Sequence, residues 1–283
     1  MRFGVHVSIG KGLPAAVRTA QTLGCDAFQI FIANPRGWQK RPLRDEEVAA
    51  FRREVQNTGL GPVVVHLSYL PNPAAEDNAL YEKSILAIAE EYQRAVMIGA
   101  AYFVVHPGKG GGQDREKAMA KVAQGVRSIL NQVEGSTLLL LENQAGAGTE
   151  VGGNLGQLAQ ILEEVNQPDR TGICFDTCHA FAAGYDLRTA EGIDRLLTEV
   201  EATVGLTRMP LIHLNDAVGE CGSHLDRHTH IGEGRIGAEG FRLFLTEPRL
   251  TGRTGILETP QKTPEDDLKN LAVLRKLAAG GKQ

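Results

Sequence analysis

Eight short apolar runs alternate with eight longer amphipathic runs along this sequence, and this alternation restricts the possible folds more than any other feature. The apolar runs have the composition of β-strands and are Phe3–Val7, Ala27–Ile32, Pro62–His66, Tyr102–His106, Leu138–Glu142, Gly172–Asp176, Pro210–His213 and Gly255–Glu258. The runs between them have helical periodicity and cover about 12–23, 45–58, 78–98, 114–133, 154–166, 189–204, 237–247 and 264–279. Eight strand–helix units in 283 residues predict an α/β fold, a (β/α)8 TIM barrel made of one domain over residues 1–283. A doubly wound open sheet is the alternative.

The residues at the helix boundaries agree with this assignment. Gly24, Gly59 and Gly99 stand where a helix end favours a left-handed residue. The segment Thr263-Pro264-Glu265 has the pattern of an N-cap, a proline in the first helical position and an acid in the first turn.

Seven of the eight apolar runs end at or near a side chain that can bind a metal ion. These side chains are His6, His66, His106, Glu142, Asp176, His213 and Glu258. In a TIM barrel the carboxyl ends of the strands surround one cavity, and active sites lie there. Imidazole and carboxylate groups together suit zinc or a similar metal, so the sequence predicts a metal site at this end of the barrel.

Two loops add candidate ligands to this set. Asp226 and His228 are two residues apart, so in an extended segment both side chains point the same way. His179 follows Asp176 across a predicted strand-to-helix turn, so the two can face different ions. The candidate ligands are then His66, His106, Glu142, Asp176, His179, His213, Asp226, His228 and Glu258, which exceeds what one zinc ion accepts and suffices for three.

Composition restricts the setting of the protein. The net charge of -4 argues against a general nucleic-acid binder, although three dications against four carboxylate ligands would still attract phosphate. The four cysteines show no disulfide spacing, which favours a reducing cytoplasm. The sequence has no long apolar run and begins with a strand pattern, so we expect neither a membrane span nor a signal peptide.

Three stretches give the chain a close resemblance to the endonuclease IV family of apurinic/apyrimidinic endonucleases. They are Leu80–Gly108, which ends in His-Pro-Gly, Gly172–Asp186 with FDTCHAFAAGYD, and His213–Gly234 with HLND and DRHTHIGEG. LLLENQAGAG, Leu138–Gly148, supports them, and the likeness covers essentially the whole chain. The resemblance implies an α/β barrel with a trinuclear zinc cluster, although Mn²⁺ or Fe²⁺ can occupy sites of this kind.

The resemblance also implies how the ligands divide among three ions. One ion is held by His66, His106 and Glu142; the second by Glu142, Asp176, His213 and Glu258; and the third by His179, Asp226 and His228. The implied activity is hydrolysis of the phosphodiester bond 5′ to abasic sites in duplex DNA, which leaves a 3′-hydroxyl and a 5′-deoxyribose phosphate. Glu142 and Glu258 are the implied catalytic carboxylates, because Glu142 bridges two ions and orients the nucleophile while Glu258 fixes the second ion.

Loops after the second and third strands match the DNA-recognition loops of the family. Asn34, Arg36 and Trp38 match the first loop and Tyr69-Leu70 the second, while Pro35 departs from the pattern of the first loop and Leu67 stands where a polar residue is expected. Arg227 is expected to reach a phosphate. The expected partner is duplex DNA bound by a monomer. The alternative function is a metal-dependent sugar isomerase or epimerase, which uses the same residue types but has no need of Arg36, Tyr69 and Leu70.

Overall fold

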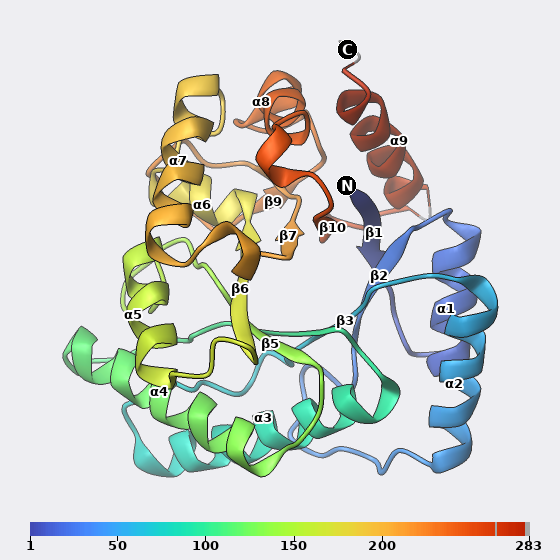
Figure 1. The fold of residues 1–283 in the computed structure, drawn as a ribbon, viewed down its shortest axis with the longest axis vertical. Helices are drawn as coiled ribbons and strands as arrows, with labels where there is room; N and C mark the ends of the chain where they lie inside the picture. Colours follow the sequence, from blue (N-terminus) through green and yellow to red (C-terminus); the bar gives the residue numbers. More distant parts are fainter. Residues whose placement is uncertain (264, 281–283) are drawn as a thin grey trace.

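Eight parallel strands close into a barrel in the computed structural model, which describes residues 1–263 and 265–280 (Figure 1). The strand order around the barrel is β1-β10-β7-β6-β5-β4-β3-β2, so β1 pairs with both β2 and β10. The barrel strands are β1 (Arg2–His6), β2 (Ala27–Phe31), β3 (Val63–His66), β4 (Tyr102–Val105), β5 (Leu138–Glu142), β6 (Thr171–Asp176), β7 (Leu211–His213) and β10 (Thr254–Leu257). The predicted TIM barrel is confirmed, and the open-sheet alternative is wrong because the sheet closes on itself.

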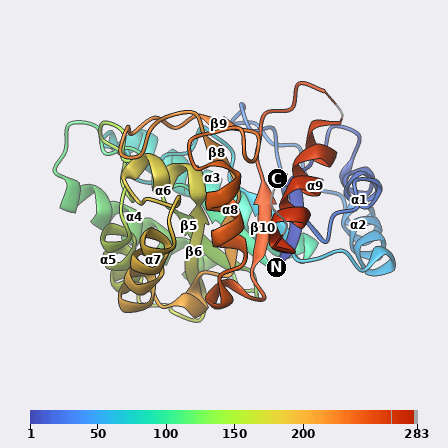
Figure 2. The ribbon, with the colours of Figure 1, turned by 90° about the horizontal axis from the view of Figure 1, so that it is seen from above.

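Helices surround this barrel and connect successive strands (Figure 2). They are α1 (Leu13–Thr22), α2 (Asp45–Thr58), α3 (Asn78–Ile98), α4 (Arg115–Gln132), α5 (Leu155–Val165), α6 (Thr177–Ala183), α7 (Ala190–Thr203), α8 (Gly237–Leu245) and α9 (Asp266–Ala278), with short 3-10 turns η1 (Leu206–Arg208) and η2 (Pro248–Leu250). The C-terminal helix α9 lies beside the N-terminal strand β1, where the sheet closes (Figure 1). Within the described ranges, none of the helices is long and apolar enough to cross a membrane.

The predicted strands and helices agree with the observed ones to within about two residues. Gly24, Gly59 and Gly99 have φ values of 70°, 68° and 77°, which confirms the left-handed residues predicted after α1, α2 and α3. The last helix begins at Asp266, whose carboxylate accepts hydrogen bonds from the backbone and side chain of Thr263. Pro264, the predicted first-position proline, lies outside the described residues.

Three short elements near the site were not predicted. Helix α6 directly follows β6, and β8 (Asp216–Ala217) pairs antiparallel with β9 (His228–Thr229) beyond the end of β7. Each is too short to show a clear periodicity in the sequence. Figure 2 shows β8, β9 and α6 together at the upper rim, where they extend the end of the barrel that carries the site.

The apolar core has two layers. Inside the barrel, every strand except β1 contributes one side chain to a packed apolar ring: Ala27, Val64, Val104, Leu140, Cys174, Leu211 and Ile256. Outside it, the other strand faces pack against the helices, as Val65 and Phe103 do. Because side chains alternate along a strand, the residue two positions beyond each interior residue also points inward. The core thus determines which side chains face the barrel opening.

Candidate metal centre

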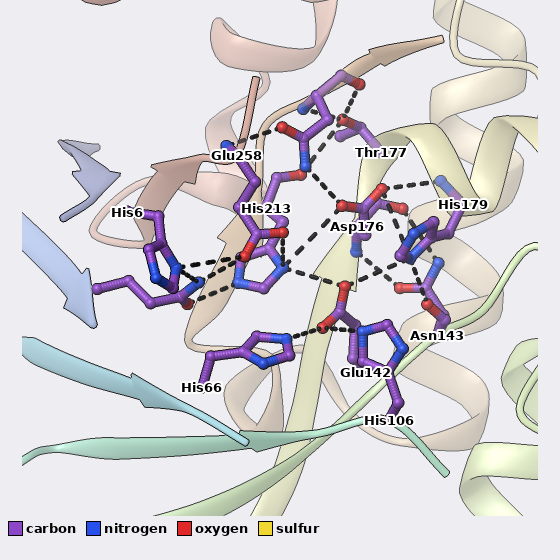
Figure 3. Close-up of polar contacts among 12 residues, drawn as sticks. His6, His66, His106, Glu142, Asn143, Asp176, Thr177, His179, His213 and Glu258 are labelled. Atoms are coloured by element: carbon purple, nitrogen blue, oxygen red, sulfur yellow. Dashed lines mark hydrogen bonds and ion pairs between the residues drawn. The ribbon is translucent and has the colours of Figure 1, made fainter. Parts of the chain in front are cut away.

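The inward-facing layer above the apolar ring is polar and lies at the carboxyl ends of the strands (Figure 3). His66 follows Val64 by two residues, and the same spacing relates the other members of the layer to the ring below, except for His6, which follows Gly4. The members are His6, Gln29, His66, His106, Glu142, Asp176, His213 and Glu258. The alternation of the strands therefore brings the predicted ligands together from segments far apart in the sequence.

Glu142 lies at the centre of these side chains, and its two oxygens face different imidazoles (Figure 3). Oε2 lies 3.2 Å from His66 Nε2 and 3.0 Å from His106 Nε2. Oε1 lies 3.0 Å from His213 Nδ1 and 3.3 Å from His179 Nδ1. Burial alone would raise the pKa of Glu142, but the His213 and His106 charges and hydrogen bonds from the imidazoles hold it well below its usual range. An ionised carboxylate with this orientation can bridge two cations.

A second group of ligand atoms shares Glu142 with the first. Atoms of Glu142, Asp176, His213 and Glu258 all lie within 4.8 Å of one another. Asp176 ends β6 and caps α6 by accepting a hydrogen bond from the backbone of His179. Burial opposes ionisation of Glu258, but the nearby His213 and His66 charges lower its pKa to about 2.

The third group combines α6 with the β8–β9 loop. His179 Nε2 lies 3.2 Å and His228 Nε2 3.5 Å from Asp226 Oδ1. Burial would raise the pKa of Asp226, but the hydrogen bond and charge of His179 lower it to about 2. Among the described residues, His228 Nε2 is buried without a hydrogen-bond partner. A buried imidazole nitrogen that receives no hydrogen bond and lies close to a carboxylate is typical of a metal ligand.

Backbone carbonyls orient three of these rings. The Nδ1–H groups of His66, His179 and His228 donate to the carbonyls of Leu67, Asn143 and Glu258, at 2.7, 2.9 and 3.2 Å. This leaves each Nε2 free to bind a cation, as is usual for metal-binding histidines. The Leu67 side chain is buried, and its carbonyl provides the bond to His66, so a polar side chain is not needed at this position.

Gln29 is a member of the polar layer that the sequence analysis missed. Its Oε1 accepts from His213 Nε2 at 2.9 Å, which leaves Nδ1 of that ring facing Glu142. Its amide group donates to Glu258 and to His6 Nδ1. Burial lowers the pKa of His6 to about 4, which keeps the ring neutral and able to accept this bond. The available signal was a single amide within the apolar strand AFQIF.

Asp216 is a second residue that the sequence analysis did not single out. Its fully buried carboxylate accepts hydrogen bonds from the backbones of Ala217, Gly232, Gly234, Ile236 and Gly237. A Cβ added at Gly234 would lie 2.4 Å from Asp216 Oδ1, so glycine permits this close approach. The bonds secure the far end of the loop that carries Asp226 and His228.

A cavity of about 690 Å³ opens above the candidate ligands, and the two predicted recognition loops border it. Arg36 and Tyr69 line it together with His66, His106, His179, Asp226, His228 and Glu258. Tyr69 is 65% exposed and Leu70 36% exposed, which is unusual for such large side chains. The rings of Tyr69 and Phe31 meet edge-on at a centroid distance of 5.1 Å, and both residues line the cavity, so Tyr69 stands at its rim.

The other predicted DNA contacts, Asn34, Trp38 and Arg227, are not among the residues that line this cavity. Asn34 is exposed and its side chain accepts a hydrogen bond from the backbone of Arg36, and Arg227 is exposed beside Asp226. Trp38 packs against α3, with the Lys83 ammonium 4.1 Å above its ring. The Lys40 side chain, in the same loop as Arg36 and Trp38, is buried, and its ammonium lies 3.1 Å from Glu91 Oε1.

Comparisons with known proteins agree over nearly the whole length. The family model of the xylose isomerase-like TIM barrel matches residues 17–277. A protein of Methanoculleus marisnigri named probable endonuclease 4 is 46% identical over 276 residues, which span 97% of this chain and 98% of that protein. A probable endonuclease 4 of Chloroflexus aurantiacus is 44% identical over 281 residues, which span 99% of each chain. The crystal structure of endonuclease IV from Thermus thermophilus has a TM-score of 0.88 at 41% identity, and the match covers 99% of this chain and 100% of that chain.

The barrel also occurs in proteins of much lower sequence identity. A D-tagatose 3-epimerase-like protein has a TM-score of 0.74 but is 20% identical, over 99% of this chain and 97% of that chain. At this identity the likeness shows the fold alone.

Proposed function

Since this chain belongs to the endonuclease IV family of xylose isomerase-like TIM barrels, we propose that it is a metal-dependent endonuclease that cleaves the phosphodiester bond 5′ to abasic sites in duplex DNA. The observation that carries the proposal is the arrangement around Glu142. Three cysteine-free groups of metal-capable side chains adjoin one another at the base of a cavity. The exposed Arg36 and Tyr69 line this cavity, and the exposed Leu70 follows Tyr69 directly. The metal-capable groups suit hydrolysis of a phosphodiester, and the exposed residues suit recognition of distorted DNA.

The donor set fits three divalent cations, and we assign zinc to them, with Mn²⁺ or Fe²⁺ as substitutes. The first site is His66, His106 and Glu142; the second is Glu142, Asp176, His213 and Glu258; and the third is His179, Asp226 and His228. Bound ions of this kind act as Lewis acids toward a phosphate and lower the pKa of water.

The residues of the chain contribute position and charge to the reaction. Glu142, ionised by its imidazole neighbours, keeps its two oxygens toward different histidines. Glu258 is fixed by the Gln29 amide on one side and faces His213 on the other. Asp226 and His228 line the cavity, and we assign the ion that they would hold to the leaving 3′ oxygen. The products are then a 3′-hydroxyl and a 5′-deoxyribose phosphate.

The rim residues supply recognition. Tyr69 and Leu70 enter the duplex at the lesion as a wedge, and Arg36 occupies the opposite side of the gap and contacts the backbone. Rotation of the abasic deoxyribose into the cavity requires little free energy, because little stacking is lost when the base is absent. Asn34, Trp38 and Arg227 stay predicted contacts at the edge of this surface.

The test is incubation with an end-labelled duplex that carries one abasic site, in parallel with the same duplex without it and with a panel of free sugars. We expect one cut on the 5′ side of the lesion, with a 3′-hydroxyl that a DNA polymerase extends. The cut should disappear on chelation and return with zinc. Conversion of a sugar without cleavage of the damaged duplex would instead support an isomerase or epimerase and refute the proposal.

The remaining expectations concern the protein as a whole. We propose that residues 1–283 form one domain, that the protein acts as a monomer and that it resides in the cytoplasm. Light scattering after gel filtration, with and without duplex, measures the mass of the particle that binds DNA.

A further inference from the structure

A buried ion pair lies beneath the two recognition loops, outside the metal centre. The Lys40 ammonium lies 3.1 Å from Glu91 Oε1, and the two side chains are 2% and 0% exposed. Lys40 belongs to the loop between β2 and α2, whereas Glu91 is on α3. A buried charge pair rarely adds much stability compared with apolar residues of the same size, so its retention calls for another role.

The same carboxylate also binds the other recognition loop. Glu91 Oε1 accepts from Ser68 Oγ at 2.6 Å, and Oε2 accepts from Ser68 N at 3.0 Å. Ser68 is buried and directly precedes Tyr69. Lys40 in addition donates to the carbonyl of Ala87 on α3 at 2.8 Å. One carboxylate therefore fixes two loops on one helix.

Two further hydrogen bonds complete the attachment of the wedge. Tyr69 N donates to the carbonyl of Pro35 at 2.9 Å, which joins the two loops directly. Beyond the wedge, Asn72 N donates to the buried Ser84 Oγ of α3 at 2.9 Å. Tyr69 and Leu70 are thus the exposed residues between two buried attachments to the same helix. This arrangement fixes the backbone of the wedge before any DNA arrives.

We propose that Glu91, together with Lys40, is a positioning residue that joins the 34–41 and 67–72 loops and keeps Tyr69 and Leu70 in the conformation that binds damaged DNA. Glu91 acts through Ser68 and does not touch the substrate. The inference rests on the proposed function for its DNA measurements, but the joining of the loops can be tested without DNA.

The decisive variant is Lys40→Met/Glu91→Leu, which replaces the buried ion pair by apolar side chains of similar volume. Glu90, which lies 3.6 Å from the Lys40 ammonium, keeps its ion pair with Arg94, so no carboxylate is left without a partner. The double substitution removes both acceptors of Ser68, so we expect the loops to separate. If the freed wedge adopts its binding conformation about a tenth of the time, the apparent Kd for abasic duplex rises about tenfold. The Kd for intact duplex should not change, because the wedge has no gap to fill there.

The matched variant is Lys40→Met/Glu91→Gln, which also lacks both charges but keeps an oxygen that can accept from Ser68. We expect it to restore the discrimination between abasic and intact duplex. A second control, Arg18→Met/Glu54→Leu, removes an ion pair of 3.1 Å between α1 and α2 and should leave all binding unchanged. Zinc content and melting temperature, measured for every variant, show whether the fold is intact.

Two measurements separate positioning from a general loss of structure. In a Tyr69→Ala background, Lys40→Met/Glu91→Leu should cause a smaller loss of binding than in the wild type, because both changes act on the same wedge and only Leu70 is left to lose. Trp38, the single tryptophan of the chain, lies two residues before Lys40, so its fluorescence reports on this loop. We expect its emission to shift to longer wavelength in the leucine variant and to return in the glutamine variant.

The possible outcomes are distinct. Wild-type discrimination in the leucine variant, equal losses on both duplexes, or additive losses with Tyr69→Ala would each overturn the proposal. So would a leucine-variant Trp38 emission that matches the wild type. If the wild-type protein does not distinguish abasic from intact duplex, the proposed function fails, and the Trp38 emission alone then decides whether Glu91 joins the loops.

Discussion

Replacement of Tyr69 by alanine tests recognition while leaving the fold and the metal centre in place. The side chain is 65% exposed and its main ring contact is the edge of Phe31. Truncation of so exposed a residue should change the free energy of unfolding by less than about 0.5 kcal/mol. Tyr69 is not a candidate ligand, so the metal content should stay the same.

The effect on binding can be worked out from the exposed area. An aromatic side chain presents roughly 150–250 Å², so about two thirds of that area is available for DNA to cover. If DNA covers about half of the available surface, burial at about 25 cal/mol per Å² contributes roughly 1–2 kcal/mol. Loss of a stacked aromatic costs about 1–3 kcal/mol in comparable proteins. We therefore expect the Kd for abasic duplex to rise by roughly 5-fold to 150-fold.

The assay is a fluorescence-anisotropy titration of abasic and intact duplexes at one salt concentration, because salt alone changes such affinities. Leu86→Ala is the matched control, since Leu86 is 70% exposed on α3. The control should bind both duplexes as the wild type does. Equal losses on damaged and intact DNA for Tyr69→Ala would show a general backbone contact and refute the wedge.

Four further predictions concern the metal centre. Glu142→Gln should lose most turnover but keep much of its affinity for abasic duplex, because an amide cannot bridge two cations with a charge; near wild-type cleavage by metal-loaded variant would contradict this. Elemental analysis of carefully loaded protein should find close to three transition-metal ions per chain, and one or none would exclude the trinuclear assignment. Metal-free protein should lose stability as pH rises above about 6.5, because burial disfavours charge on His179 and His213 but neighbouring carboxylates outweigh it and raise both pKa values. It should also lose stability below about pH 4, as the carboxyl of Glu258 is protonated on approach to its folded pKa of about 2. Zinc should stabilise the protein more at pH 8 than at pH 5, because binding displaces the imidazole protons; melting curves of chelated and loaded protein check this, and equal stabilisation at both pH values would contradict it.

The sequence was sufficient for the barrel because its signals are local. An apolar strand followed by an amphipathic helix is visible in any one unit, and eight repetitions leave few other folds. The alternation along a strand also fixes which side chain faces inward, so His66, His106 and Glu142 could be assigned to one end of the barrel before any distance was known. Residues brought together by the repeating geometry of a barrel are predictable from the repeat itself.

The parts that escaped prediction depend on contacts between segments far apart in the sequence. Gln29 is an ordinary strand residue until the sheet closes and places it between His213 and Glu258. Asp216 gained its role only from a loop that folds back over it.

Lys40 shows the same limit most clearly. From the sequence alone, Lys40 cannot be distinguished from an exposed lysine of a surface loop. Only the packing of α3 against two loops buries it together with Glu91. Its environment is formed by Ser68 and Glu91, which lie far from it along the chain. A local sequence pattern around Lys40 therefore cannot predict these contacts. The sequence by itself determined the barrel and the inward-facing candidate ligands, because strand periodicity and side-chain chemistry act locally. Tertiary structure alone decided how those ligands are oriented and how the wedge is held, because desolvation and hydrogen bonding depend on which distant groups surround each side chain.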